Sequence, residues 1–193
     1  MIISKTILDR GIIMKKAIII LTDGFEEMEA LVPADILRRA GVDVSLASIG
    51  GSDEVIGSHG IKVIADTALT ASAADAADML ILPGGPGASA YIQDKTLTDA
   101  LIRRNAGGGL ISAICAAPLT LGKLGLLKSK AATCYPGLKD DLEASVYKPD
   151  AVVTDGNITT ARAAGASAEF GMALAEILAG PEEAGRVRAA MYL

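Results

Sequence analysis

The sequence has no tryptophan and a single histidine, and aromatic residues make up only 3% of its 193 residues. Stacking platforms for bases and aromatic cages for ammonium groups are therefore not expected. Basic charge is also scarce, because 18 Lys and Arg face 23 Asp and Glu and give a net charge of −5. A phosphate-binding surface needs clustered Lys and Arg, so we expect no nucleic acid partner.

Long apolar runs are missing as well. Although 51% of the residues are hydrophobic, no run approaches the ~20 residues that span a bilayer, so no membrane partner is expected. The only cysteines are Cys115 and Cys134, and with one histidine they match no zinc-ligand spacing, which predicts no metal. Residues 1–13 precede Met14 and lack the shape of a signal peptide, because Asp9 and Arg10 interrupt them.

We therefore interpret residues 1–13 as an extension or start-site artefact and residues 14–193 as a single domain, and we expect it in the cytoplasm, with free thiols. Short β-branched runs alternate with helical patterns along this domain. Strands are expected at 15–21, 42–49, 78–82 and 110–114, and hairpins around 57–60 and 155–156. The alternation predicts a doubly wound α/β fold, with a mostly parallel sheet and helices on both faces.

Two helices show specific signals. The first is expected to begin with Asp23 as its N-cap, to kink or restart at Pro33, to end at Gly41, and to bury Met28, Leu31, Val32 and Ile36. The last is expected to close the chain before Gly180 and Pro181, and to bury Phe170, Leu174, Ile177 and Leu178.

Cys115 lies between the last residue of a buried strand and a helix with Pro118 in its first turn. This order predicts a sharp strand-to-helix turn at the sheet edge where α/β proteins bind ligands. A helix N-terminus there would lower the pKa of the thiol, and the amides after Cys115, beginning with that of Ala116, could face an oxyanion. A small buried core cysteine is the alternative interpretation.

Two further strand ends carry suitable groups. Glu29 lies one turn inside a helix that faces the same edge, where it could exchange a proton with Cys115, although first-turn acids are usually solvated. Gly84 and Gly85 could let backbone amides approach a carbonyl oxygen, or could simply form a turn. The segment GGPG fits no phosphate or dinucleotide motif, so no phosphate or nucleotide site is expected, and a cysteine nucleophile with an acid–base group needs no cofactor.

Four segments at compatible spacings resemble the ThiJ/PfpI superfamily: ILTDGFEEMEALVPADILRRAG, LILPGGPGA, LISAICAAPLTL and TTARAAGASAEFG. The nearest branch is that of the Parkinson-disease protein deglycase and the bacterial YajL-type proteins. The resemblance implies a flavodoxin-like three-layer sandwich, a homodimer, Cys115 as nucleophile and Glu29 as its carboxylate partner. It also implies that Gly84, Gly85 and Ala116 frame an oxyanion pocket.

The chain departs from relatives at three positions. Peptidase-like branches have histidine where this chain has Ala116, and the human-type branch has histidine where it has Tyr135, beside Cys134. His59 stands where relatives often carry arginine, so His59 and Tyr135 are candidates for lining the pocket, with a solvated loop histidine as the alternative. A Cys-His-Asp triad needs a histidine beside the cysteine, and His59 is the single histidine of the sequence, which disfavours proteolysis. Cys134 is interpreted as structural or as a bystander.

The resemblance implies a cofactor-independent glyoxalase that converts methylglyoxal to lactate, or a deglycase that acts on glycated protein, in carbonyl and oxidative stress. A rival hypothesis is a redox-sensing chaperone in which Cys115 is oxidised to a sulfinic acid. Turnover distinguishes them, because a sensor is consumed stoichiometrically and an enzyme is not.

Overall fold

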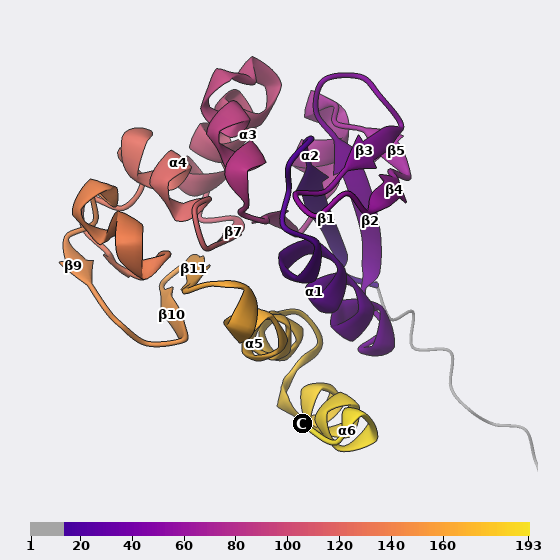
Figure 1. The fold of residues 1–193 in the computed structure, drawn as a ribbon. Coiled ribbons are helices and arrows are strands. Elements are labelled where there is room, and N and C mark those ends of the chain that lie inside the picture. Colours follow the sequence, from indigo (N-terminus) through magenta and orange to yellow (C-terminus); the bar gives the residue numbers. More distant parts are fainter. Residues whose placement is uncertain (1–13) are drawn as a thin grey trace, which may run out of the picture.

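The computed structural model describes residues 14–193, so the interpretation of residues 1–13 lies outside the described part of the chain. A seven-stranded sheet in the order β10-β11-β7-β6-β1-β2-β5 forms the centre (Figure 1). Every neighbouring pair is parallel except the pair β10–β11. The chain moves from β1 to β2 on one side and then to β6 on the other, which is the doubly wound, flavodoxin-like order. The predicted fold class is confirmed.

The strands of this sheet are short and mostly buried. They are β1(Lys16–Leu21), β2(Asp43–Ser48), β5(Thr67–Ala68), β6(Met79–Leu82), β7(Leu110–Ile114), β10(Val152–Asp155) and β11(Ile158–Ala161). Two smaller pairs stand apart from it, the antiparallel hairpin β3(Glu54–Ile56)–β4(Lys62–Ile64) and the parallel pair β8(Ala131–Ala132)–β9(Val146–Tyr147). The hairpins predicted around 57–60 and 155–156 are confirmed as β3–β4 and β10–β11.

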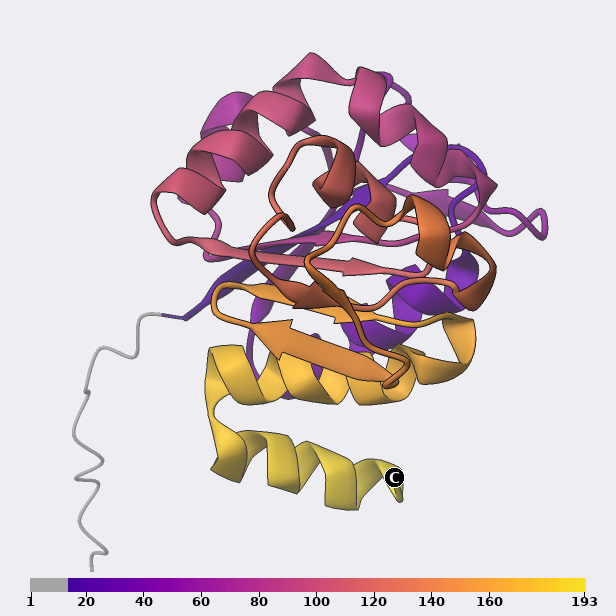
Figure 2. The same cartoon turned by 90° about the vertical axis from the view of Figure 1, so that its left-hand side faces the viewer.

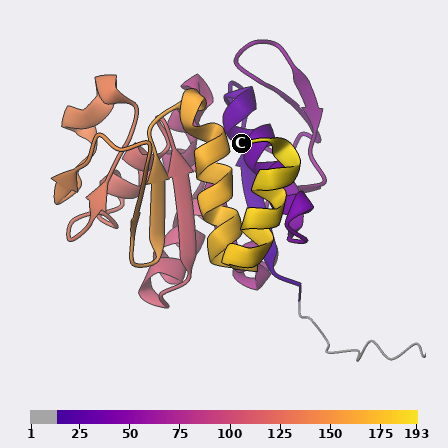
Figure 3. The ribbon, with the colours of Figure 1, turned by 90° about the horizontal axis from the view of Figure 1, so that it is seen from below.

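Helices cover both faces of the sheet and complete the three layers (Figure 2). One face is covered by α1(Glu27–Arg39) and α5(Ser167–Ala179), with α6(Pro181–Met191) beside α5 (Figure 3). The other is covered by α2(Ala71–Ala76), α3(Lys95–Ala106), α4(Pro118–Lys123) and the 3-10 helix η1(Pro86–Gln93). Two further 3-10 helices are η2(Pro136–Asp141) and η3(Ala164–Ala166). No helix within 14–193 is long and apolar enough to cross a membrane.

Helix α1 differs from its prediction in three respects. Its N-cap is Glu26 and not Asp23, because the Glu26 side chain accepts a hydrogen bond from the backbone of Glu29, while Asp23 accepts one from Ile56 and ties the loop to β3. The helix does not restart at Pro33 but continues through it. Met28 is 50% exposed, because the buried stripe of the helix runs instead through Ala30, Pro33 and Leu37.

The C-terminal end also differs from the prediction. Helix α6 follows α5 directly, because Pro181 occupies the first turn of a new helix after Gly180, which has a φ of +90°. The buried side chains of α6 are Ala184 and Val187, which lie on its inner side. Ile177 was expected to point inward with Phe170 and its neighbours but is 38% exposed.

We expect Gly171→Val in α5 to destabilise the fold by about 1–3 kcal/mol, as overpacking does. A Cβ at Gly171 would lie 2.8 Å from Cδ1 of Ile36 and 3.1 Å from Cα of Pro33, where α5 packs on α1. Gly185→Ala in α6 is the control, because a Cβ there meets nothing within 4 Å, and it should be neutral or slightly stabilising. Urea unfolding measures both; equal midpoints would contradict the packing described here.

Candidate active site

Cys115 is the first residue after β7 and has a φ of +64°, a left-handed conformation that is rare for residues other than glycine. Its N–H donates to the carbonyl of Ala161 at 2.9 Å, and its carbonyl accepts from the N–H of Tyr135 at 2.8 Å. Backbone on both sides thus holds the turn in a strained conformation. The predicted sharp turn is present, and it leaves Cys115 partly exposed.

Glu29 lies in the first turn of α1, and its side chain is completely buried. Its Oε2 accepts a hydrogen bond of 2.8 Å from the N–H of Gly84. Its Oε1 is also buried and makes no hydrogen bond of ordinary geometry. The thiol of Cys115 and the amide of Ala164 are nevertheless close enough to lower the pKa of this carboxyl. Glu29 is therefore a buried acid beside the thiol and not a solvated first-turn acid.

Gly84 lies between the carboxyl and the thiol. A Cβ at this position would be 2.6 Å from Oε2 of Glu29, 2.7 Å from Cβ of Cys115 and 2.8 Å from the carbonyl oxygen of Ile114. No side chain fits in that space, so a glycine is required for the two functional groups to approach each other. Gly84 thus serves a purpose other than the predicted approach to a carbonyl oxygen, because its N–H binds Glu29 and its missing side chain lets the carboxyl and the thiol lie close together.

Burial raises the pKa of Glu29 to about 7, against the lowering effects of the Cys115 thiol and the Gly84 amide. Burial also raises the pKa of Cys115, and the charge of ionised Glu29 raises it further, to about 12. Two groups that interact this strongly titrate as a pair. Once Glu29 is ionised it raises the pKa of the thiol, so the pair holds one proton, which lies mainly on the thiol and which the two groups share by exchange.

The expectation that a helix N-terminus lowers the pKa of Cys115 is therefore wrong. Helix α4 has only six residues, and Cys115 precedes its N-cap, Ala117. The amides of Gly85 and Ala116 do act on the sulfur to lower its pKa, but burial and Glu29 outweigh them. A reactive sulfur at neutral pH consequently depends on Glu29 accepting the shared proton.

The three residues expected to frame an oxyanion pocket divide into two roles. The amides of Gly85 and Ala116 both face the sulfur of Cys115, where an oxyanion formed on an attacked carbonyl would lie. The amide of Gly84 is already engaged by Glu29. Gly84 thus positions the carboxyl, and two donors remain for substrate.

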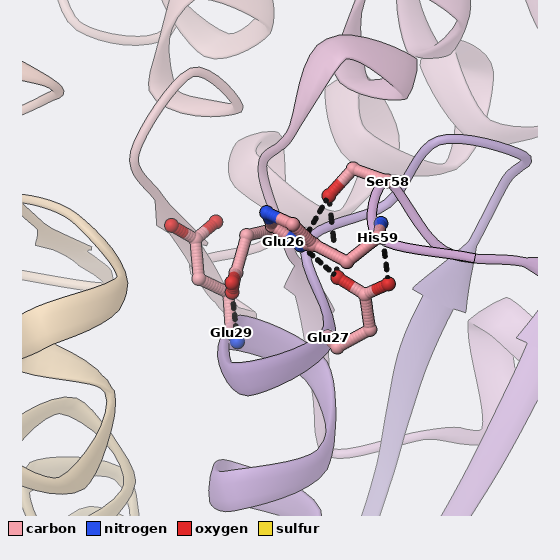
Figure 4. Close-up of polar contacts among 5 residues, drawn as sticks. All are labelled: Glu26, Glu27, Glu29, Ser58 and His59. Atoms are coloured by element: carbon pink, nitrogen blue, oxygen red, sulfur yellow. Dashed lines mark hydrogen bonds and ion pairs between the residues drawn. The ribbon is translucent and has the colours of Figure 1, made fainter. Parts of the chain in front are cut away.

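His59 pairs with Glu27 at the start of α1. Its Nδ1 is 2.7 Å from Oε2 of Glu27, and its backbone N–H donates to Oε1 at 2.7 Å. Burial tends to raise the pKa of Glu27, but the bonds from His59 and Ser58 lower it to about 2, and the same ion pair raises the pKa of His59. Figure 4 shows the carboxylate of Glu29 directed away from this pair. His59 thus joins the β3–β4 hairpin to α1.

Within residues 14–193, Glu26, Glu27 and His59 are the one group of three whose potential metal-ligand atoms lie within 4.8 Å of one another. Both oxygens of Glu27 already accept hydrogen bonds from the hairpin, and Glu26 caps α1. Both carboxylates therefore already have hydrogen-bond partners within the protein, and we assign no metal to this group.

Tyr135 is attached to the site through its backbone, since its N–H binds the carbonyl of Cys115. Its side chain is 49% exposed, and its ring lies against Gly137, where a Cβ would be 3.2 Å from Cε1. Cys134 is fully buried, and its thiol donates to the carbonyl of Tyr135 at 3.3 Å. It packs with the core on the α3–α4 side of the sheet, while Cys115 packs against the core on the α1–α5 side.

Sequence reasoning assigned no role to the last residue of β11 or to the loop that follows it. Ala161 accepts from the N–H of Cys115, and Ala164 supplies an amide to Glu29. The available signal was topological, because a strand that pairs with β7 ends at the same edge of the sheet. Backbone contacts carry no side-chain signature, so the residue types alone did not reveal them.

Glu29→Gln should remove a pH dependence from folding stability. The pKa of Glu29 is about 7 in the folded chain, against an ordinary value of 4.5. Its protonation therefore stabilises the fold fully below about pH 4.5, and this contribution, about 3 kcal/mol, is lost as the pH rises through 7. Urea unfolding at pH 4.5 and pH 8 should show the loss in wild-type and in Glu27→Gln but not in Glu29→Gln. An equal loss in all three would contradict the assignment.

The fold and the site define an α/β protein with a cysteine on a strained strand-to-helix turn and a buried carboxyl as its partner. Residues 15–177 match the model of the DJ-1/PfpI family, and the chain belongs to this family. It is 42% identical over 172 residues to Protein dj-1beta of Drosophila melanogaster, covering 88% of this chain and 92% of that protein. The crystal structure of Drosophila melanogaster DJ-1beta superposes with a TM-score of 0.87, over 93% of this chain and 98% of that one.

Two other relatives have informative names. The chain is 34% identical over 173 residues to the glutathione-independent glyoxalase DJR-1.2 of Caenorhabditis elegans, covering 88% of this chain and 91% of that protein. A structure of oxidized Toxoplasma gondii DJ-1 superposes with a TM-score of 0.86 at 34% identity, over 92% of this chain and 98% of that one.

Proposed function

We propose that residues 14–193 form a cofactor-independent cysteine enzyme that acts on small 2-oxoaldehydes and converts methylglyoxal to lactate. The pairing of Cys115 with the buried Glu29 carries the proposal, because it supplies a nucleophile and a proton carrier beside two free amides. The glyoxalase name of a relative at 34% identity supports the same chemistry.

In the proposed reaction the sulfur of Cys115 attacks the aldehyde carbon while Glu29 holds the shared proton, and a C–S bond forms. The amides of Gly85 and Ala116 stabilise the developing oxyanion, which then takes the proton from Glu29 to give a hemithioacetal. As a carboxylate again, Glu29 removes the proton on the former aldehyde carbon, giving an enediolate, and returns it to the adjacent carbon. The proton of the hemithioacetal hydroxyl passes to the former keto oxygen in the same rearrangement. The resulting 2-hydroxy thioester reacts with water to release lactate and the thiol.

A pKa near 7 suits Glu29 to both halves of this cycle, since the group must accept and donate a proton at neutral pH. The deglycase reaction uses the same residues, with the hemithioacetal or aminocarbinol carried by a glycated protein. Both reactions fit a cytoplasmic role in carbonyl and oxidative stress.

A homodimer is part of the proposal. The apolar side chains Met28, Ile56, Ile61 and Ile64 are 41–66% exposed at the start of α1 and on the β3–β4 hairpin. A second copy of the chain would cover them. Sedimentation equilibrium should give a mass near twice 19.7 kDa; a monomer at micromolar concentration would exclude this part of the proposal.

The redox-sensing alternative also uses Cys115, which is partly exposed, and one solved structure of a relative is named as oxidized. The test is lactate formed from methylglyoxal, without glutathione, counted per molecule of protein. Many turnovers support the enzyme. No turnover, together with a mass gain of two oxygens on Cys115 after mild peroxide, supports the sensor.

A further inference from the structure

A cavity of about 210 Å³ opens beside the candidate site, between η1 and α4. Gly85 and Ala116 belong to its wall, and their amides are also the two that face the sulfur of Cys115. An oxygen bound by these amides would therefore lie at the edge of the cavity. The proposed reaction with methylglyoxal uses nothing deeper in it.

The lining of the cavity is mainly apolar and comes from three elements. Ile92 of η1, Leu119 of α4 and Leu138 of η2 contribute half-buried side chains. Among the residues described, no acidic side chain lines it, and the one cation, Lys123, is exposed to solvent. Such a lining favours an uncharged apolar group over a cation.

The volume limits the size of the occupant. Since one water-sized group takes about 30 Å³ of liquid volume, the cavity holds roughly seven such groups. The methyl group of methylglyoxal would leave most of it empty. A butyl, phenyl or benzyl group would fill more of the apolar wall and gain binding energy away from the reacting carbon.

We propose that this cavity is a specificity subsite for the substituent on the keto carbon of a 2-oxoaldehyde, and that it selects apolar substituents of about four to seven carbons. The inference rests on the proposed function for its substrate class. It predicts that larger apolar 2-oxoaldehydes are preferred to methylglyoxal in kcat/KM by tenfold or more, since one methylene in an apolar pocket already changes a rate by roughly that factor.

The test uses a probe that does not require turnover. Cys115 is alkylated with N-benzyl and with N-methyl 2-chloroacetamide, the sulfur displacing chloride while the reagent carbonyl lies near the two amides, and intact mass gives both rates. The ratio of the benzyl to the methyl rate should be at least ten in wild-type. It should fall severalfold in Ile92→Phe and in Leu119→Phe, which fill the cavity from η1 and from α4. Ile102→Phe, on the exposed side of α3, is the matched control and should keep the wild-type ratio.

A benzyl-to-methyl rate ratio near one in wild-type would refute the proposed subsite. So would a high ratio that neither Ile92→Phe nor Leu119→Phe lowers. The two proposals fail separately. Lactate formation with a ratio near one would leave the reaction standing without the subsite. A high ratio that the filling variants lower, without any lactate, would leave the subsite standing and refute the proposed reaction.

Discussion

Cys115→Ser should lower lactate formation from methylglyoxal by at least about a thousandfold, because a serine hydroxyl is a much weaker acid and nucleophile than a thiol and cannot give up its proton to Glu29 as the thiol does. The substitution is nearly isosteric, so the strained turn and its bonds to Ala161 and Tyr135 should persist. Coupled-enzyme detection of lactate measures the effect.

Cys134→Ser is the matched control for this experiment. A serine hydroxyl can replace the thiol that donates to the carbonyl of Tyr135, and Cys134 packs on the other side of the sheet from Cys115. Most of the activity should remain. Activity that survives Cys115→Ser, or that disappears equally in both variants, would refute the role of Cys115 as nucleophile.

Glu29→Gln should lower kcat/KM for methylglyoxal by about 10²–10⁴, the range for loss of a general acid–base. The amide can still accept from Gly84, so the geometry should be retained, but it cannot carry the shared proton. In wild-type, activity should rise with pH through about 7, because the proton-accepting carboxylate forms in that range. The residual activity of Glu29→Gln should lack this rise.

Glu27→Gln is the control for Glu29→Gln, since Glu27 lies in the same turn but pairs with His59 (Figure 4). Its pKa is about 2, far below the range of the activity profile. It should keep both the activity and the rise through pH 7. If Glu27→Gln lost the rise and Glu29→Gln kept it, the assignment of the two carboxyls would be reversed.

The sequence patterns predicted the architecture well because buried parallel strands produce continuous apolar runs, as in β1 and β6. They failed to predict helix ends that depend on contacts with other parts of the fold. Asp23 is a better N-cap than Glu26 by residue type, but β3 engages Asp23 and leaves the cap to Glu26. Similarly, α6 starts at a proline that sequence reasoning interpreted as the end of the last helix.

For the candidate site, the residue types and their positions at strand ends were sufficient to indicate Cys115 and Glu29. The electrostatics could not be predicted, because they depend on the burial of the carboxyl and on its distance from the thiol. The position of Cys115 suggested a lowered pKa, whereas the buried pair raises the pKa of both groups. The contribution of the end of β11 and of the loop after it is made by backbone atoms, so the segment TTARAAGASAEFG supported the family resemblance without indicating which groups contact Cys115 and Glu29.

The most direct measurement is an infrared titration of the Glu29 carboxyl, identified as the C=O band that is absent from Glu29→Gln. We expect this band to disappear with a midpoint near pH 7. In Cys115→Ala the midpoint should be higher, because the thiol that favours the ionised form has been removed. A midpoint near 4.5 in wild-type, unchanged in Cys115→Ala, would contradict the shared proton and the mechanism built on it.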